Sequence, residues 1–176
     1  GSTGIPTTAL RAGIIVGPGG SSFSMVRKLV ERLPALVCPS WTRTKTDPIA
    51  LTDALTIIKF CVGNPVTYNR HTDIAGREQT TYMQMIATTA KVMGKKRLIL
   101  PIRYVPVWLS RLWVAKITGE STELVGPLVE SLEHEMIAEE NEILQQFPQR
   151  MNYTEAARYA LAYEGVRPFL PTRLTE

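Results

Sequence analysis

The chain has 176 residues, a hydrophobic fraction of 44% and a formal net charge of +4. This length and composition are sufficient for one globular domain with a substantial core, and they exclude a disordered chain. The basic residues are scattered except for Lys95-Lys96-Arg97, so we expect no nucleic-acid partner. No apolar run reaches the roughly 18 residues of a membrane span, and we expect a cytoplasmic protein.

The first predicted element is a strand that runs from Thr7 to Val16 and leads into the turn Gly17-Pro18-Gly19-Gly20. Its continuous apolar run predicts a strand covered on both faces, as in a parallel sheet. Such a strand needs βαβ neighbours, and no segment before Thr7 supplies one. We therefore expect the chain to be the second part of a larger protein.

The glycine-rich turn lies between a strand and a helix, where a phosphate site is expected. A dinucleotide fingerprint needs a third glycine at position 22, which is Ser22, and an acidic residue about 20 positions later. Residues 36–46 contain no acidic residue. The turn is therefore not a first-strand dinucleotide site, although a turn at the carboxyl end of a parallel strand still faces the crevice where ligands bind.

The rest of the chain alternates between strand and helix patterns. Helical spacing and capping residues predict helices from Ser21 or Ser22 to Leu33, from Thr52 to about Gly63, and from Thr80 or Thr81 to Met93. Further helices are predicted over 107–117, 123–132 and 154–163, and strands over 36–38, 66–76 and 98–102. This order indicates an α/β or α+β domain.

The predicted loop over residues 40–48 carries an aromatic side chain and two cations between a strand and a helix. Trp41, Arg43 and Lys45 could stack on and hydrogen-bond a polar or anionic ligand. An ordinary exposed loop anchored by its tryptophan is an equally good interpretation.

No catalytic residue and no metal site is predicted. The two histidines, His71 in a predicted strand and His134 in an acidic helical region, are interpreted as surface or packing residues, and Cys38 and Cys61 as buried free thiols. Neither pair shows metal-ligand spacing. The acidic residues between Glu133 and Glu142 are interpreted as a solvated helical face. The helically spaced Trp108 and Trp113 are interpreted as packing residues.

Several segments together resemble one known superfamily. They occur in the expected order over nearly the whole chain: residues 10–19, Ser22-Phe23-Ser24-Met25-Val26-Arg27, Pro39-Ser40-Trp41, Asp73-Ile74-Ala75-Gly76, and Pro127-Leu128-Val129-Glu130-Ser131-Leu132. This set resembles the extended and atypical short-chain dehydrogenases/reductases, the NAD-dependent epimerase/dehydratase-like proteins. The chain has neither the glycine fingerprint nor the Tyr-x-x-x-Lys pair that the N-terminal half of that superfamily carries.

The resemblance therefore implies a C-terminal part of such a protein. The implied fold is α/β, with α+β character as a fragment: the last strands of a Rossmann-like sheet and a small mixed substrate domain rich in helices. Residues 1–176 would form a single C-terminal substrate-binding domain, in which residues 1–20 are the remaining strand and turn of a nucleotide-binding domain.

The resemblance also implies site residues. NAD(P) is the cofactor implied for the full-length protein, with Gly17, Pro18 and Gly19 near the nicotinamide, and we do not expect this chain alone to bind it. The implied substrate is a small molecule. A nucleotide sugar is one such substrate, which is implied only by analogy with proteins of the same fold. Its binding residues would be Ser22, Phe23, Arg27, Trp41 and Arg43.

Two functions follow as hypotheses. The first is the substrate-binding portion of an NAD(P)-dependent epimerase/dehydratase or reductase-like protein, which is catalytically incomplete by itself although its full-length parent is an enzyme. The second is a non-catalytic protein that uses the NAD(P)-binding fold as a binding or assembly module. In either case the exposed N-terminal strand could mediate self-association.

Overall fold

The computed structural model describes residues 4–103, 105–119 and 121–165. Its helices are α1 (Ser21–Arg32), α2 (Leu51–Cys61), α3 (Tyr82–Val92), α4 (Val107–Thr118), α5 (Thr122–Ser131), α6 (Glu142–Gln146) and α7 (Tyr153–Tyr163), with 3-10 turns η1 (Ser40–Arg43) and η2 (Pro65–Thr67). Its strands are β1 (Thr8–Ala12), β2 (Ile15–Val16), β3 (Ala35–Cys38), β4 (Lys45–Thr46), β5 (Ile49–Ala50), β6 (Arg70–Ile74), β7 (Thr80–Thr81) and β8 (Leu98–Pro101).

The strands pair two by two. β1 pairs with β6, β2 with β5 and β3 with β8, all in parallel, whereas β4 and β7 are antiparallel. Each parallel pair is joined through at least one helix, because parallel strands need a crossover connection. The predicted mixture of helices and strands is therefore confirmed, and the parallel pairs form small two-stranded sheets.

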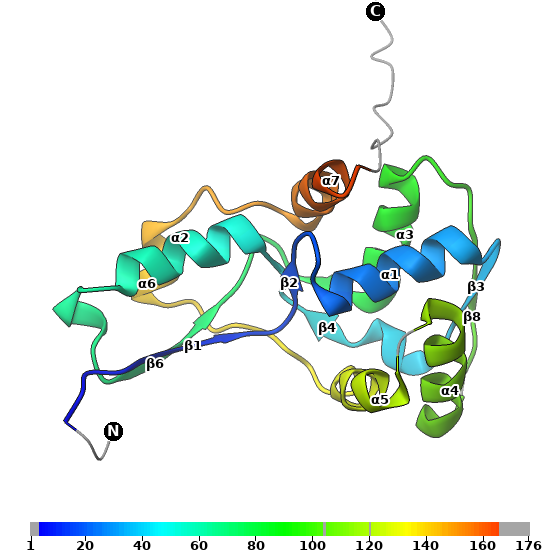
Figure 1. Ribbon diagram of the computed structural model, residues 1–176, viewed down its shortest axis with the longest axis horizontal. Coiled ribbons are helices and arrows are strands. Elements are labelled where there is room, and N and C mark those ends of the chain that lie inside the picture. Colours follow the sequence, from blue (N-terminus) through cyan, green and yellow to red (C-terminus); the bar gives the residue numbers. More distant parts are fainter. Residues whose placement is uncertain (1–3, 104, 120, 166–176) are drawn as a thin grey trace, which may run out of the picture.

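The elements form two lobes, seen side by side in Figure 1. The smaller lobe holds β1, β6, α2 and α6, whose core includes Ile57, Ile74 and Leu144. The larger lobe holds α1, α3, α4, α5 and the β3–β8 pair. Helix α7 packs its buried face, including Tyr153 and Leu161, into a central core with Phe23 and Met85.

The N-terminal strand differs from its prediction. The run from Thr7 to Val16 divides into β1 and β2, which pair with different strands. Residues in β1 alternate between half-buried and exposed, so it is not covered on both faces, and Ile15 is also exposed. The chain passes Met136 so closely at Gly13 that a Cβ there would lie 3.1 Å from the Met136 Cβ. An apolar run cannot reveal such a break, because its residues suit either arrangement.

The predicted helix boundaries are only partly confirmed. Thr81 caps α3 as predicted, since its hydroxyl accepts from the Gln84 N–H while the Gln84 side chain accepts from the Thr81 N–H. Helix α1 follows Gly20 with no side-chain cap, and α2 begins at Leu51 rather than after Thr52. Neither helix therefore begins with the predicted side-chain cap.

Four other predictions were wrong in part. Residues 40–48 contain η1 and β4 instead of a loop, and residues 66–76 contain the end of η2 before β6. The acidic segment before α6 is solvated but not helical over 132–141, and His134 lies there in a turn. Trp113 packs as predicted, whereas Trp108 is 62% exposed.

Both cysteines are buried free thiols, as predicted. None of the helices within the described ranges is long and apolar enough to cross a membrane. The same residues contain no group of three or more side chains suited to holding a metal ion.

We expect the free energy of unfolding to fall as the pH rises above about 9. Burial raises the pKa of the Cys38 thiol above its ordinary 9.0 and the pKa of the Tyr82 phenol above 10.0. The folded state therefore holds these protons more tightly than the unfolded state does. The two groups contribute their full stabilisation at a pH below their pKa values in the unfolded chain, and this stabilisation is lost as the pH rises through their higher pKa values in the folded chain. Urea unfolding at neutral and alkaline pH measures the effect, and a flat profile would contradict it.

Candidate functional site

An apolar cavity of about 100 Å³ lies within the larger lobe, between α1, α3, α4, α5 and the η1 turn. Its lining residues include Met25 and Leu29 of α1, Ile86 of α3, Val114 of α4 and Val129 of α5. None of the lining residues that the structure describes carries a charge. An apolar hollow with a few polar groups is the usual form of a small-molecule site.

Two of the lining residues are Trp41 and Tyr82. The Trp41 Nε1 atom and the Tyr82 hydroxyl oxygen are buried and make no hydrogen bond of ordinary geometry with the described residues. Tyr82 as a whole is only 4% exposed. A buried donor left unpaired costs about 1–3 kcal/mol, so such atoms call for an explanation. Both atoms are buried away from solvent, so a molecule in the cavity would reach them only after neighbouring side chains move.

Tyr82 is placed by strand pairing and capping. It is the first residue of α3, directly after the Thr81 cap, and the pairing of β7 with β4 sets Thr46 opposite Thr80. Burial raises the pKa of Tyr82, and its interaction with the Thr46 hydroxyl offsets part of this increase. Neither hydroxyl makes a hydrogen bond of ordinary geometry. The Tyr82 phenol therefore keeps its proton at neutral pH.

Trp41 is held by the backbone of η1. The Thr42 hydroxyl donates to the Pro39 carbonyl oxygen at 2.6 Å, and the Thr44 N–H donates to the Trp41 carbonyl oxygen at 3.1 Å. These local bonds fix the turn and set the indole against Met25 and Val125. The indole is thus anchored against the core and also lines the cavity, whereas Arg43 and Lys45 are exposed.

A pair of tyrosine substitutions tests whether the Tyr82 hydroxyl is unpaired. Tyr153→Phe should lower the free energy of unfolding by about 1–3 kcal/mol, because it leaves the buried Thr89 hydroxyl, 2.8 Å from the Tyr153 oxygen, without its partner. Tyr82→Phe should change it by less than about 0.5 kcal/mol, since no good hydrogen bond is lost. Urea unfolding compares the two. Equal losses would show that the Tyr82 hydroxyl is already paired.

The structure brings together only two of the five predicted substrate-binding residues. Ser22 and Trp41 both line the cavity. Phe23 is fully buried in the central core, and Arg43 is exposed at the end of η1, so neither is part of the wall. Arg27 is held in ion pairs with Glu31 at 2.7 Å and Glu164 at 3.0 Å.

The glycine turn after β2 does not fit a phosphate. The Gly19 N–H donates to Glu164 Oε1 at 3.1 Å, so a carboxylate from the end of α7 already holds that donor. Gly19 has φ +73°, which favours glycine, and a Cβ at Gly17 would lie 2.5 Å from the Leu51 Cβ. Turn geometry and close packing therefore explain these glycines.

Removing the Glu164 carboxylate should weaken this junction. We expect Glu164→Ala to lower the free energy of unfolding by about 1–2 kcal/mol, because the partly buried Arg27 loses one ion pair and the Gly19 N–H loses its acceptor. Glu142→Ala is the matched control, since its ion pair with Arg70 is exposed and should contribute less than about 0.5 kcal/mol. Thermal or urea unfolding distinguishes the two, and equal effects would contradict this role for Glu164.

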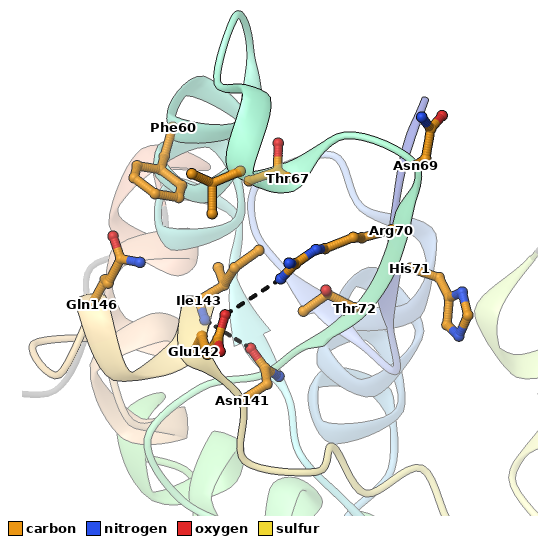
Figure 2. A pocket seen from close by; sticks show the side chains of 11 residues that line it. Phe60, Thr67, Asn69, Arg70, His71, Thr72, Asn141, Glu142, Ile143 and Gln146 are labelled. Atoms are coloured by element: carbon orange, nitrogen blue, oxygen red, sulfur yellow. Dashed lines mark hydrogen bonds and ion pairs between the residues drawn. The ribbon is translucent and has the colours of Figure 1, made fainter. Parts of the chain in front are cut away.

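A second pocket, of about 330 Å³, lies in the smaller lobe beside β6 and α6. Figure 2 shows Arg70 reaching toward Glu142, 3.3 Å away, while the His71 side chain points away from this pair. Both charged side chains are largely exposed, and each neutralises the other. Its two charges are already paired with each other, so we take the apolar cavity as the candidate site.

Sequence reasoning gave Tyr82 no role. One signal for its position was available, because the capping box at Thr81 and Gln84 predicts which residue begins the helix. The cavity itself depends on how four helices pack, which no local pattern reveals.

No protein-family model matches the chain, and no curated protein matches it. Solved structures do. A triphenylmethane reductase from Citrobacter sp. has a TM-score of 0.68 at 15% identity, covering 92% of this chain and 55% of that one. A Bacillus cereus UDP-glucuronic acid 4-epimerase, in complex with UDP-glucuronic acid and NAD, has a TM-score of 0.58 at 16% identity, covering 90% and 45%.

A nucleoside-diphosphate-sugar epimerase from Staphylococcus aureus is similar at a TM-score of 0.62 and 12% identity, covering 89% of this chain and 53% of that one. The chain therefore spans about half the length of the structures it matches. At identities this low, the structural similarity shows a shared fold and nothing more. This fold agrees with the one expected from the sequence.

Proposed function

We propose that this chain, which shares its fold with NAD(P)-dependent reductases and sugar epimerases, is the substrate-binding portion of such a protein. The observation that carries the proposal is the apolar cavity that Ser22 and Trp41 line. An apolar cavity with a few polar groups can hold and orient a substrate.

The proposal assigns binding to this chain and hydride transfer to a larger assembly. Transfer needs a cofactor and an acid-base group held in one geometry. None of the six tyrosines is followed four residues later by a lysine, and the glycine turn does not fit a phosphate. Ser22 and Trp41 would contact substrate, and Gly17, Pro18 and Gly19 would lie near the nicotinamide of the complete protein.

Activity and binding measurements on the same preparation test this division. The 176-residue chain should not oxidise NADH or NADPH in the presence of carbonyl substrates. Small-molecule ligands should still shift the NMR signals of Trp41 and the other residues that line the cavity. Turnover in proportion to the concentration of the chain would overturn the division. If no small molecule shifts the NMR signals of the residues that line the cavity, the substrate-binding role is overturned.

A binding or assembly module remains the second candidate function, and a specific observation favours it. Exposed apolar side chains gather on β8 and α4, including Leu98, Leu100, Trp108 and Leu112. Exposed apolar groups of this kind are typical of protein-protein contacts. Self-association on sedimentation, weakened by Trp108→Ser, would support this function, and a strict monomer at high concentration would count against it.

A further inference from the structure

The outer face of the β3–β8 pair is apolar and exposed. Val37 and Leu100 are partners in the strand register, and both are exposed, as is Leu98. Side chains alternate between the two faces of a strand, and the neighbouring Leu36 and Cys38 are buried in the core. One face of this two-stranded sheet therefore packs on the larger lobe, and the other presents branched apolar side chains to solvent.

Helix α4 extends this apolar surface. It follows β8 after a short connection, and β3, β8 and α4 lie at the same end of the larger lobe (Figure 1). Trp108 and Leu112 are four positions apart, so they share one side of the helix, and both are exposed. Trp113 and Val114 instead pack inward. Lys116 continues the exposed side by a further four positions.

We call this surface the β8–α4 face. Its exposed apolar residues in the range 98–112 are Leu98, Leu100, Ile102, Trp108, Leu109 and Leu112. Its exposed cations are Lys96, Arg103 and Lys116, which make no ion pair among the residues that the structure describes.

The charge around this face has one sign. Residues 79–119 contain seven lysines and arginines, whereas all sixteen acidic residues of the chain lie outside this segment. The neighbouring helix α5 carries Glu123 and Glu130, and Glu130 is already paired with Arg111 at 2.6 Å. Positive charge without a paired carboxylate therefore flanks the exposed apolar side chains.

An apolar surface flanked by cations has the chemistry that binds an anionic lipid bilayer. Tryptophan and leucine side chains enter the boundary between headgroups and acyl chains, while lysine and arginine reach the lipid phosphates. Each cation close to an anionic surface strengthens binding about five-fold. Three such cations beside six apolar side chains are sufficient for reversible attachment without a membrane-spanning helix.

A second copy of the chain fits this face less well. Two copies that met through it would bring their cations together, and like charges placed opposite one another oppose association. Among the described strands β8 pairs only with β3, which leaves its other edge open. Strand pairing along that edge is disfavoured by Pro101, which ends β8, and by the preceding Lys95-Lys96-Arg97.

We propose that the β8–α4 face docks this protein on the surface of an anionic lipid membrane. Its apolar side chains lie in the headgroup region, and its three exposed cations contact lipid phosphates. This proposal does not rest on the cavity or on any substrate. It assigns to lipid a surface that self-association would otherwise use.

Co-sedimentation of the 176-residue chain with lipid vesicles tests the proposal. Vesicles of phosphatidylcholine alone are compared with vesicles that also contain phosphatidylserine. We expect binding about ten-fold or more tighter to the anionic vesicles, and a loss of this preference at high salt. Binding should also shift tryptophan fluorescence to shorter wavelength, and Trp108→Phe should remove that shift.

Matched variants locate the contact. Leu112→Ser should weaken vesicle binding roughly ten-fold. Leu55→Ser should leave it unchanged, because Leu55 is a similarly exposed leucine, 54% against 51%, on α2 of the smaller lobe.

The cations are tested in the same way. The double variant Lys96→Gln/Lys116→Gln should weaken binding to anionic vesicles about twenty-fold. Lys45→Gln/Lys59→Gln makes the same charge change at exposed positions outside the face and should cost less than about two-fold. All four positions are exposed, so urea unfolding should show equal stability for the two double variants.

Each outcome bears on the lipid assignment alone. Failure to bind either kind of vesicle, equal binding to both, or equal losses in the face variants and their controls would overturn it. Self-association without vesicle binding, weakened by Leu112→Ser, would assign the face to a second copy of the chain and would also overturn it. The substrate-binding role is judged separately, by the NMR signals of the residues that line the cavity.

Discussion

Replacing Phe23 with alanine is expected to lower the free energy of unfolding by about 3–5 kcal/mol. Phe23 is fully buried and belongs to the central core with Val16, Met85 and Leu161. Truncating its ring removes apolar contact from three elements and leaves a cavity where α1 and α7 meet the β2 segment. Urea unfolding followed by far-UV circular dichroism measures the loss.

The same position separates a core role from a substrate-binding role. Phe23→Leu retains most of the apolar volume and should cost less than about 1.5 kcal/mol, with ligand affinity unchanged. A Phe23→Leu chain of normal stability that no longer binds ligand would show that Phe23 contacts the substrate, as the resemblance implied.

Replacing Gly76 with alanine is expected to cost about 3 kcal/mol or more. Gly76 follows β6, and its N–H donates to the Pro48 carbonyl oxygen at 3.1 Å. An added Cβ would lie 2.2 Å from that oxygen and 3.0 Å from the Met151 carbonyl oxygen. Both obstacles are backbone atoms, so the segments before β5 and α7 would have to separate.

Gly63→Ala provides the comparison. Gly63 has φ +72° with open space around it, so alanine there should cost only about 1 kcal/mol through backbone strain. Guanidinium unfolding of both variants measures the difference. A Gly76→Ala chain as stable as Gly63→Ala would contradict the close approach of these three segments.

Local chemistry made much of this fold predictable. Helical spacing located α1, α3 and α7, and the Thr81 capping box gave the start of α3. The break between β1 and β2 was not predictable, because it depends on Met136, which is more than 100 positions away. The conformation of the acidic segment before α6 was not predictable either, because solvated carboxylates fit an extended chain as well as a helix.

The candidate site was predictable only in part. Trp41 stood out as an aromatic residue in a polar segment, and Ser22 was implied by the resemblance. The ion pair of Arg27 with Glu164 could not be predicted, because Glu164, which directly follows α7, is close to Arg27 in space and far away in sequence. Tyr82 became a candidate only when burial showed that its hydroxyl lacks a good partner.

We infer that the cavity between α1 and α5 is a ligand site. A high-resolution crystal structure of the chain with a small aromatic compound such as acetophenone tests this inference most directly. We expect the phenyl ring to lie inside the cavity. An empty or collapsed cavity at saturating ligand would contradict the inference.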